Sequence, residues 1–235
     1  MLLAIDVGNT STSFGVFKGI KLVKRWVCKT TALKTLDLKQ YRAYEVDIAS
    51  VVHDADIVLK KKLPHAKFIT AKGIKSLKIT IHGDVGADRA VNAFAAKELY
   101  SCPAIVVDFG TATTFDVISK DGKYIGGAIV PGIRMAADAL HENTSKLPRI
   151  NILKPKKLIG NSTVEAMRSG VFYGYIALVE GMINRFKSEM KNPKSNLSVI
   201  ATGGFAKFIG KYSQGIDIID QDLTLKGISL LCQKN

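Results

Sequence analysis

The sequence predicts an α/β fold built from two similar halves, and two observations support this prediction. Segments with the alternating apolar pattern of strands take turns along the chain with segments that have the spacing of amphipathic helices, which is typical of α/β proteins. In addition, residues 2–17 (LLAIDVGNTSTSFGVF) and 104–119 (AIVVDFGTATTFDVIS) share one pattern. In both, an apolar run ends at an Asp, and a Gly and a hydroxyl-rich turn follow before the alternation resumes. We therefore expect an internal repeat.

The strands of this repeat are predicted by alternation and by turn residues. After each hydroxyl-rich turn the chain resumes a period of two, as a strand does when it pairs back on its predecessor. In the second half, Asp121-Gly122 is the signal of a type I′ turn, and we expect a hairpin there. Residues 197–204 (LSVIATGG) predict a buried strand that ends in a glycine turn.

Two helices are predicted by apolar spacing and by a cap. Residues 88–100 place their apolar side chains on one helical face. Residues 162–190 begin with a capping box of the form S-x-x-E and keep helical spacing of apolar residues along their length. Gly170 and Gly174 lie four residues apart in this second helix. They would allow close helix packing or a contact between subunits.

Composition limits the classes of function. Of the 235 residues, 47% are apolar and 23% are charged, as in a folded globular protein. Cys28, Cys102 and Cys232 lie far apart and form no C-x-x-C pair, which favours a reducing cytoplasm over a zinc or redox site. No basic residue precedes Asp6, and no apolar run reaches the roughly 18 residues of a membrane span. We therefore expect a cytoplasmic protein with no membrane partner.

The net charge of +14 raises the question of a nucleic-acid partner. The 34 basic residues are spread along the whole chain, and no aromatic residues lie among the densest runs, at 60–62 and 154–157, to stack on bases. A solvated basic surface is the simplest explanation, and attraction of an anionic ligand or a nucleic acid is the alternative. A nucleic-acid partner is therefore not expected.

Asp6 and Asp108 occupy the same position in the two copies of the repeat, each with a glycine two residues later. Glycine lets the backbone reach positive φ and lets a ligand approach closely. Backbone N–H groups and Ser or Thr hydroxyls in such turns bind anions, so two turns facing one another would hold a polyphosphate. A P-loop, a G-x-G-x-x-G segment after a strand, a G-x-S-x-G elbow and a metal-ligand spacing of His are all absent from the sequence.

Several segments resemble, in their order along the chain, the motifs of type III pantothenate kinases. They are DVGNT (6–10), GADRAVNAFAA (86–96), DFGTATTFDVI (108–118), GGAIVPGIRM (126–135), KLPRI (146–150), GNSTVEAMRSG (160–170), ATGG (201–204) and DLTLKGI (222–228). That family belongs to the superfamily of acetate kinase, sugar kinases, Hsp70 and actin. The resemblance covers nearly the whole chain. It implies two ribonuclease H-like, actin-like ATPase subdomains, which we expect at residues 1–99 and 100–235, with ATP in the cleft between them.

The resemblance also implies a reaction, its cofactors and its site residues. The reaction is phosphorylation of pantothenate by ATP to 4′-phosphopantothenate, the first step of coenzyme A biosynthesis. Mg²⁺ and a monovalent cation, K⁺ or NH₄⁺, are the implied cofactors, and a homodimer is the implied assembly. The family's ATP-binding residues fall on Asp6, Val7, Gly8, Asn9, Thr10, Ser11, Thr12, Ser13, Thr111, Gly203 and Gly204. Its pantothenate-binding residues fall on Gly86, Ala87, Asp88, Arg89 and Thr163.

Asp88 matches the family's general base and Asp108 its monovalent-cation ligand. Phosphoryl transfer needs an aligned hydroxyl, neutralised phosphate charge and a group that takes the proton. Asp6, at the end of a strand, can orient Mg²⁺ through its water shell, and Arg89 can hold a substrate carboxylate by charge-assisted hydrogen bonds. Simpler roles stay open: turn caps for Asp6 and Asp108, an N-cap for Asp88, a surface position for Arg89 and support of a helix start for Thr163.

Two segments depart from the family's pattern. The family usually has a tyrosine and a proline-containing stretch before GADR, whereas residues 78–85 (KITIHGDV) offer Ile79 and no proline, and His53 stands where proline is common. We expect a differently lined substrate pocket, to which an aromatic side chain from elsewhere could contribute. For Arg134, a phosphate contact and a surface position both stay open. The rival functions are a kinase of another small hydroxyl compound and a non-catalytic transcription regulator, which the three retained aspartates disfavour.

Overall fold

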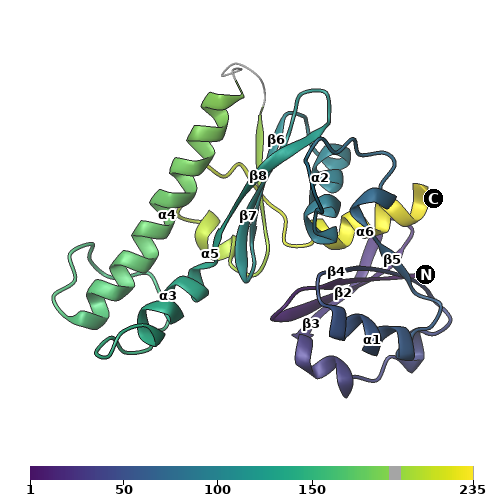
Figure 1. The fold of residues 1–235 in the computed structure, drawn as a ribbon, viewed down its shortest axis with the longest axis horizontal. Helices are drawn as coiled ribbons and strands as arrows, with labels where there is room; N and C mark the ends of the chain where they lie inside the picture. Colours follow the sequence, from purple (N-terminus) through teal and green to yellow (C-terminus); the bar gives the residue numbers. More distant parts are fainter. Residues whose placement is uncertain (191–196, 235) are drawn as a thin grey trace. The chain divides into compact units, whose positions relative to one another are not determined.

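Two five-stranded sheets with the same strand order form the framework of the protein (Figure 1). The computed structural model describes residues 1–190 and 197–234. The order is β3-β2-β1-β4-β5 in the first sheet and β8-β7-β6-β9-β10 in the second. Each strand of the first sheet therefore has a counterpart five strands later, which confirms the predicted repeat.

In the first sheet, β1 (Leu2–Val7) is the central strand. It pairs antiparallel with β2 (Ser11–Lys18) and parallel with β4 (Glu45–Ser50). The edge strands are β3 (Lys21–Lys29), which is antiparallel to β2, and β5 (Lys67–Ile69), which is parallel to β4. Because β1 is hydrogen-bonded to a strand on each side, the position of its last residues, and of the turn that follows them, is fixed.

Helices cover both faces of this first sheet. Helix α1 (His53–Lys62) packs its Leu59 into a core with the inward-facing residues of β1 and β2. Helices α2 (Ala87–Leu99) and α6 (Leu223–Lys234) pack against one another, and both contact β4. Figure 1 shows α1 and α6 on opposite sides of the sheet. Short 3-10 helices complete the connections at Thr30–Lys34, Lys39–Tyr41 and Ala71–Gly73.

The second sheet packs on the longest helix of the described chain. Its strands are β6 (Ala104–Phe109), β7 (Ala112–Ile118), β8 (Tyr124–Pro131), β9 (Ser198–Thr202) and β10 (Ile218–Ile219). Its helices are α3 (Ile133–Glu142), α4 (Thr163–Glu189) and α5 (Ala206–Gly210). Buried side chains of α4, such as Phe172 and Val179, share a core with Val107 and Phe109 of β6. Since β1 and β6 have the same burial pattern, Asp6 and Asp108 are each the half-buried residue next to the strand's end.

The predicted helices are confirmed as α2 and α4, and the cap of α4 differs in one detail from a full capping box. The Ser162 hydroxyl accepts a hydrogen bond from the Glu165 N–H at 3.3 Å, as predicted. The Glu165 carboxylate, however, accepts from the N–H of Asn161 at 3.2 Å. Two backbone donors are therefore satisfied, one in the first turn of α4 and one on the residue that precedes the cap.

The prediction of a two-residue type I′ turn between β7 and β8 is wrong. The Gly122 N–H donates to the carbonyl of Ser119, and the Ser119 N–H donates to the carbonyl of Lys123, both at 2.9 Å. These two bonds enclose three residues, with Gly122 at φ 71°. Such three-residue loops place a left-handed residue last, so the same Asp-Gly pair serves a longer turn.

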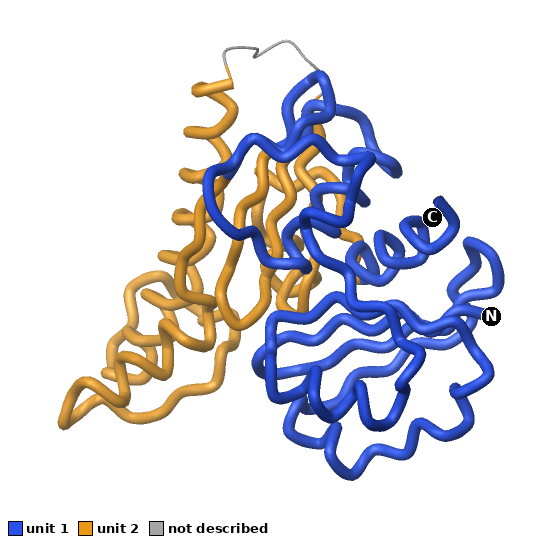
Figure 2. The backbone as a smooth tube through the Cα atoms, turned by 45° about the vertical axis from the view of Figure 1, so that its right-hand side comes forward, with its two compact units in different colours: residues 1–104, 118–126, 222–235 blue, residues 105–117, 127–221 orange. Residues whose placement is uncertain are grey.

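The chain divides into two compact units (Figure 2). One consists of residues 1–104, 118–126 and 222–235, and the other of residues 105–117 and 127–221. The first unit is therefore discontinuous in sequence, and its final helix is α6. The boundary after residue 99 stays a prediction. Among the described residues, none of the helices is long and apolar enough to cross a bilayer.

Candidate active site

The turn between β1 and β2 is held in shape by its own backbone and by Thr30. The Gly8 N–H donates to the Ser11 carbonyl at 3.0 Å. The Thr30 hydroxyl donates to the Gly8 carbonyl at 2.6 Å and lies 3.1 Å from the hydroxyl of Thr12, while the Thr30 N–H donates to the Thr10 carbonyl at 3.1 Å. Thr30 follows β3, more than twenty residues after Gly8, and sequence reasoning did not find it.

Within this turn, the predicted nucleotide-binding residues differ in their access to a ligand. The side chains at the tip are exposed, those that face the sheet are buried, and the rest are half-buried. The exposed residues are Asn9, Thr10 and Ser11, the buried ones Val7 and Thr12, and the half-buried ones Asp6, Gly8 and Ser13. A ligand can therefore meet the tip and the rim of the turn, whereas the hydroxyl of Thr12 is used inside the protein.

Asp88 lies in the first turn of α2, and its carboxyl group is fixed in place. The backbone N–H of Arg89 donates to the Asp88 Oδ1 at 2.8 Å. Burial raises the pKa of the Asp88 carboxyl above its ordinary value, and the hydrogen bond and the charge of Arg89 oppose this rise. A Cβ atom on Gly86 would lie 2.6 Å from the same Oδ1. The glycine therefore leaves the space that the carboxyl group occupies.

Val51 connects the β1 end to the start of α2. Its N–H donates to the Val7 carbonyl at 3.2 Å, so it extends the hydrogen bonding of β1 by one residue. Its Cγ1 atom lies 3.6 Å from where a Cβ of Gly86 would be. Val51 therefore links Val7, the residue after Asp6, to Gly86, two residues before Asp88, within one compact unit.

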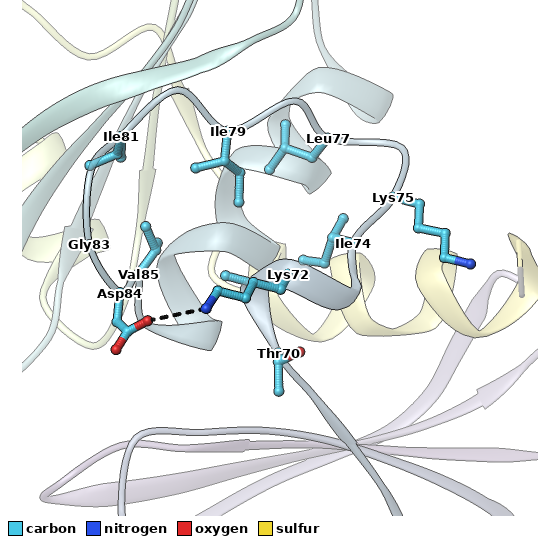
Figure 3. Close-up of a pocket in the computed structure, with 11 residues that line it drawn as sticks. Thr70, Lys72, Ile74, Lys75, Leu77, Ile79, Ile81, Gly83, Asp84 and Val85 are labelled. Atoms are coloured by element: carbon cyan, nitrogen blue, oxygen red, sulfur yellow. Dashed lines mark ion pairs between the residues drawn. The ribbon is translucent and has the colours of Figure 1, made fainter.

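The segment that departs from the family's pattern lines a cavity of about 650 Å³ (Figure 3). Ile74, Leu77 and Ile79 follow one another around its wall, which Ile81 and Val85 continue toward Gly86. At the rim, Lys72 and Asp84 form an exposed ion pair of 3.8 Å. Ile79 thus belongs to an aliphatic wall that ends one residue before the Gly86–Arg89 segment.

Arg89 lies over an aromatic side chain from a distant part of the chain. Its Cζ atom is 6.0 Å from the centroid of the Tyr124 ring, and Tyr124 is fully buried. The Tyr124 backbone also pairs with Ile79 in an isolated parallel bridge. An aromatic residue from elsewhere therefore supports this region, although it lies beneath Arg89 and not on the cavity wall.

In the second unit, Asp108 lies against the glycine turn after β9. A Cβ on Gly203 would lie 2.4 Å from the Asp108 Oδ1 and within 2.8 Å of the Phe109 backbone, and Gly203 has a φ of +89°. The Phe205 N–H donates to the Phe109 carbonyl at 3.3 Å. The Asp108 carboxyl and the predicted nucleotide residues Gly203 and Gly204 therefore lie together.

The start of α3 lies against the turn between β6 and β7 and against Phe205. The Gly132 N–H donates to the Thr111 carbonyl at 3.1 Å, and a Cβ on Gly132 would lie 2.2 Å from that oxygen. The guanidinium of Arg134 lies 5.7 Å from the centroid of the Phe205 ring. Thr163, by contrast, is the exposed first residue of α4. The predicted site residues thus form one group in the first unit and a second group, with Thr163 apart, in the other.

The two half-buried aspartates fit the implied cations in donor type. Carboxylate oxygen is the donor that Mg²⁺ takes, and that ion usually keeps several waters and binds through one or two carboxylates and phosphate oxygens. Among the described residues, no group of three or more His, Cys, Asp or Glu could hold a metal ion by itself. Asp6 can thus serve a phosphate-bound Mg²⁺, and Asp108, beside a glycine turn, can serve a monovalent cation.

Solved structures of other proteins share the fold of this chain. A protein of Campylobacter jejuni described as belonging to the Baf family of transcriptional activators matches with a TM-score of 0.69 at 20% identity, over 99% of this chain and 98% of that chain. The polyphosphate/ATP-glucomannokinase of Arthrobacter sp. strain KM matches with a TM-score of 0.53 at 14% identity, over 100% and 99%. These likenesses show the fold alone, which is the α/β fold of actin-like ATPases and sugar kinases.

Sequence comparison then shows the family within that class. The profile of type III pantothenate kinase matches residues 2–185. The type III pantothenate kinase of Halalkalibacterium halodurans is 44% identical over 100% of both chains. The chain therefore belongs to the type III pantothenate kinase family, transferases that phosphorylate pantothenate in coenzyme A biosynthesis.

Proposed function

We propose that the primary hydroxyl of pantothenate attacks the γ-phosphorus of ATP in line, that the bond from this phosphorus to the bridging oxygen breaks and ADP leaves, and that Asp88 takes the hydroxyl proton. The observation that carries this role is the half-buried Asp88 carboxyl, whose pKa is raised by burial and whose Oδ1 is held by the Arg89 N–H. A base is most effective when its pKa approaches the working pH, so the rise favours proton transfer. The fixed oxygen leaves Oδ2 as the atom that accepts the proton.

The nucleotide-binding residues in this proposal are those that the two copies of the repeat supply. The exposed hydroxyl and backbone groups between Asp6 and Ser13 contact the phosphates, and Thr111, Gly203 and Gly204 are further nucleotide contacts. Asp6 would hold Mg²⁺ through water, and Asp108 would hold K⁺ or NH₄⁺. When bound, these cations neutralise phosphate charge, which is the main requirement of phosphoryl transfer.

Pantothenate binding is assigned to Gly86, Ala87, Asp88 and Arg89, with Thr163 as a further contact. The guanidinium of Arg89 is suited to the carboxylate of pantothenate because its planar fork can donate two parallel hydrogen bonds. The same side chain lowers the pKa of Asp88, so it keeps the base from becoming too strongly protonated. Arg89 would therefore orient the substrate and adjust the base.

A coupled ADP-release assay tests this mechanism. The wild-type protein is assayed with ATP, Mg²⁺ and pantothenate, with and without K⁺, and Asp88→Asn is compared with it. We expect the substitution to preserve folding, since Asn keeps the shape of the side chain, and to lower kcat by roughly 10²- to 10⁴-fold. Near-wild-type turnover of Asp88→Asn would refute its role as the base. Equal rates without any monovalent cation would refute the role of Asp108.

We also propose that a second copy of the chain covers the groove between α3 and α4. This groove, of about 550 Å³, is lined by apolar and small residues that include Leu140, Gly170, Gly174 and Leu178. A Cβ on either glycine would meet nothing within 4 Å, and both leucines are more than a third exposed. Small residues four apart let a second helix approach closely, which favours a helical partner of the same kind.

Sedimentation velocity at micromolar concentration tests the dimer. We expect a dimer for the wild type and a monomer for Leu178→Glu, because the charge would be desolvated in the interface. Ile57→Glu, at an exposed apolar residue of α1, is the matched control and should stay dimeric. A monomeric wild type would contradict the proposal.

The three cysteines are free, as suits the reducing cytoplasm in which we place the reaction.

A further inference from the structure

We propose that Tyr124 is a positioning residue that holds Arg89 in the orientation needed for the substrate carboxylate. The proposal rests on the proposed function, in which Arg89 binds pantothenate. Tyr124 begins β8, and it is separated from Arg89 by 35 positions in the sequence. The two residues nevertheless belong to the same compact unit.

The backbone of Tyr124 is tied to the segment that precedes α2. Its N–H donates to the Lys78 carbonyl at 2.9 Å. Its carbonyl accepts from the Thr80 N–H at 3.0 Å and from the Thr80 hydroxyl at 3.2 Å. Three hydrogen bonds on one residue leave its backbone little freedom, so the direction of its Cα–Cβ bond is fixed.

The buried ring of Tyr124 therefore provides a surface on which the long, flexible side chain of Arg89 lies. Arginine has several rotatable bonds, and a guanidinium that is free in water samples many orientations. Here the Arg89 Cζ lies 6.0 Å from the centroid of a ring that is fully buried. The ring face attracts the cation, and the attraction strengthens when both groups are removed from water. An ordered guanidinium loses less entropy when it binds a carboxylate, which lowers the KM of the substrate.

The same residue also positions the cavity wall. Ile79 lies between the two residues that bond to Tyr124, and it contributes to the aliphatic cavity of Figure 3. Tyr124 thus holds the apolar wall of this cavity through its backbone and contacts the Arg89 guanidinium through its ring. Where the family pattern has a tyrosine, this chain has Ile79, and the aromatic ring beside the site comes from Tyr124.

The first experiment measures KM and kcat for three variants. Tyr124→Phe keeps the ring, and we expect the pantothenate KM to stay within about twofold of wild type. Tyr124→Leu keeps a buried apolar side chain but removes the ring. We expect its pantothenate KM to rise about 5- to 30-fold, with the KM for ATP unchanged. Tyr41→Leu, at another buried tyrosine of the same unit, is the matched control and should leave both KM values unchanged.

Two further measurements separate positioning of Arg89 from general loss of packing. With the pantothenate analogue whose carboxylate is replaced by an alcohol, Tyr124→Leu and wild type should have equal KM values. In an Arg89→Gln background, Tyr124→Leu should raise the pantothenate KM no further, because coupled residues are non-additive. If Tyr124→Leu does not fold, phenylalanines with one to three fluorine atoms at residue 124 weaken the ring's attraction at nearly constant volume. The KM should then rise with each fluorine.

The outcomes that overturn the proposal differ from those that overturn the proposed function. An unchanged pantothenate KM in Tyr124→Leu, or a flat fluorine series, refutes the positioning role while wild-type turnover is retained. A KM rise of the same size for the alcohol analogue also refutes it. Absence of pantothenate turnover in the wild type, or an unchanged pantothenate KM in Arg89→Gln, refutes the proposed function itself.

Discussion

Replacement of Gly86 by alanine should reduce catalysis far more than stability. Gly86 has φ −57° and ψ 141°, which alanine adopts without strain. The new Cβ, however, would lie 2.6 Å from the Asp88 Oδ1 and 3.6 Å from the Val51 Cγ1. An ordinary contact begins at 3.4 Å, so the carboxyl oxygen must move by about 0.8 Å. The atom that yields is the end of a side chain, and the backbone can stay in place.

The two consequences have different sizes. A glycine-to-alanine change at a compatible backbone conformation stabilises a protein by about 0.4 to 1 kcal/mol, through the unfolded chain. Displacement of the carboxyl offsets this gain, so we expect the unfolding free energy to stay within about 1 kcal/mol of wild type. A misplacement of about 1 Å in a reacting group can cost about 100-fold in rate. We therefore expect kcat to fall about 100-fold in a protein that unfolds almost normally.

Urea unfolding and the coupled ADP-release assay, applied to the same preparation, measure both consequences. Gly181→Ala is the matched control, because a Cβ there meets nothing within 4 Å and the position lies inside α4. It should gain up to about 1 kcal/mol and keep its kcat. In an Asp88→Asn background, Gly86→Ala should cause no further loss of kcat. An unchanged kcat in Gly86→Ala would refute the inference that this glycine positions the base.

Three other predictions concern titration and backbone strain. Burial raises the pKa of Asp88 and Arg89 lowers it, so kcat/KM should fall on acidification around a pKa above the ordinary aspartate value. Arg89→Gln should move this acidic limb of the pH–rate profile to higher pH. A limb that does not shift in this variant would contradict the prediction. Asp47 is 5% exposed, its Oδ1 has no hydrogen-bond partner, and burial raises its pKa against the opposing effect of Lys67. The folded chain then binds this proton more readily than the unfolded chain, so the unfolding free energy should fall as pH rises through the raised pKa. Asp47→Asn should remove that fall, and identical urea midpoints for both proteins from about pH 4 to about pH 7 would contradict it. Gly203→Ala combines a φ of +89° with backbone collisions, and denaturation should show a loss of about 1 to 3 kcal/mol or more, whereas wild-type stability would show that the turn can relax.

The parts of the fold that sequence predicts well are those with a local cause. The repeat was predictable because an apolar run, an Asp and a glycine-rich turn are contiguous in both copies, and β1 and β6 indeed share one burial pattern. Helices α2 and α4 were predictable from apolar spacing and, for α4, from a cap. The hairpin turn after β7 was not, because Asp-Gly suits both a two-residue and a three-residue loop, and the choice depends on strand pairing.

Contacts between distant segments had no local signal. Thr30 follows an exposed strand and carries no motif, yet its hydroxyl and its N–H both bond to the turn between β1 and β2. Tyr124 lies in none of the motifs that the sequence offers. Its relation to Arg89 depends on a parallel bridge to Ile79, and single bridges of this kind have no period to detect. Sequence reasoning therefore named residues expected to touch substrates and missed those that hold them.

The two glycines beside the candidate carboxylates show what a motif leaves undetermined. The motifs GADR (86–89) and ATGG (201–204) both contain glycine, and the usual reason for a glycine in a motif is a positive φ. Gly203 has that reason, with φ +89°, but a Cβ there would also lie 2.4 Å from the Asp108 Oδ1. Gly86 has an ordinary φ of −57°, so a larger residue there would disturb the position of the Asp88 Oδ1 and not the backbone. The two positions should consequently respond differently to alanine: at Gly203 the backbone is strained and stability falls, while at Gly86 the carboxyl moves and the rate falls. Only coordinates separate these causes, because both produce the same letter in the sequence.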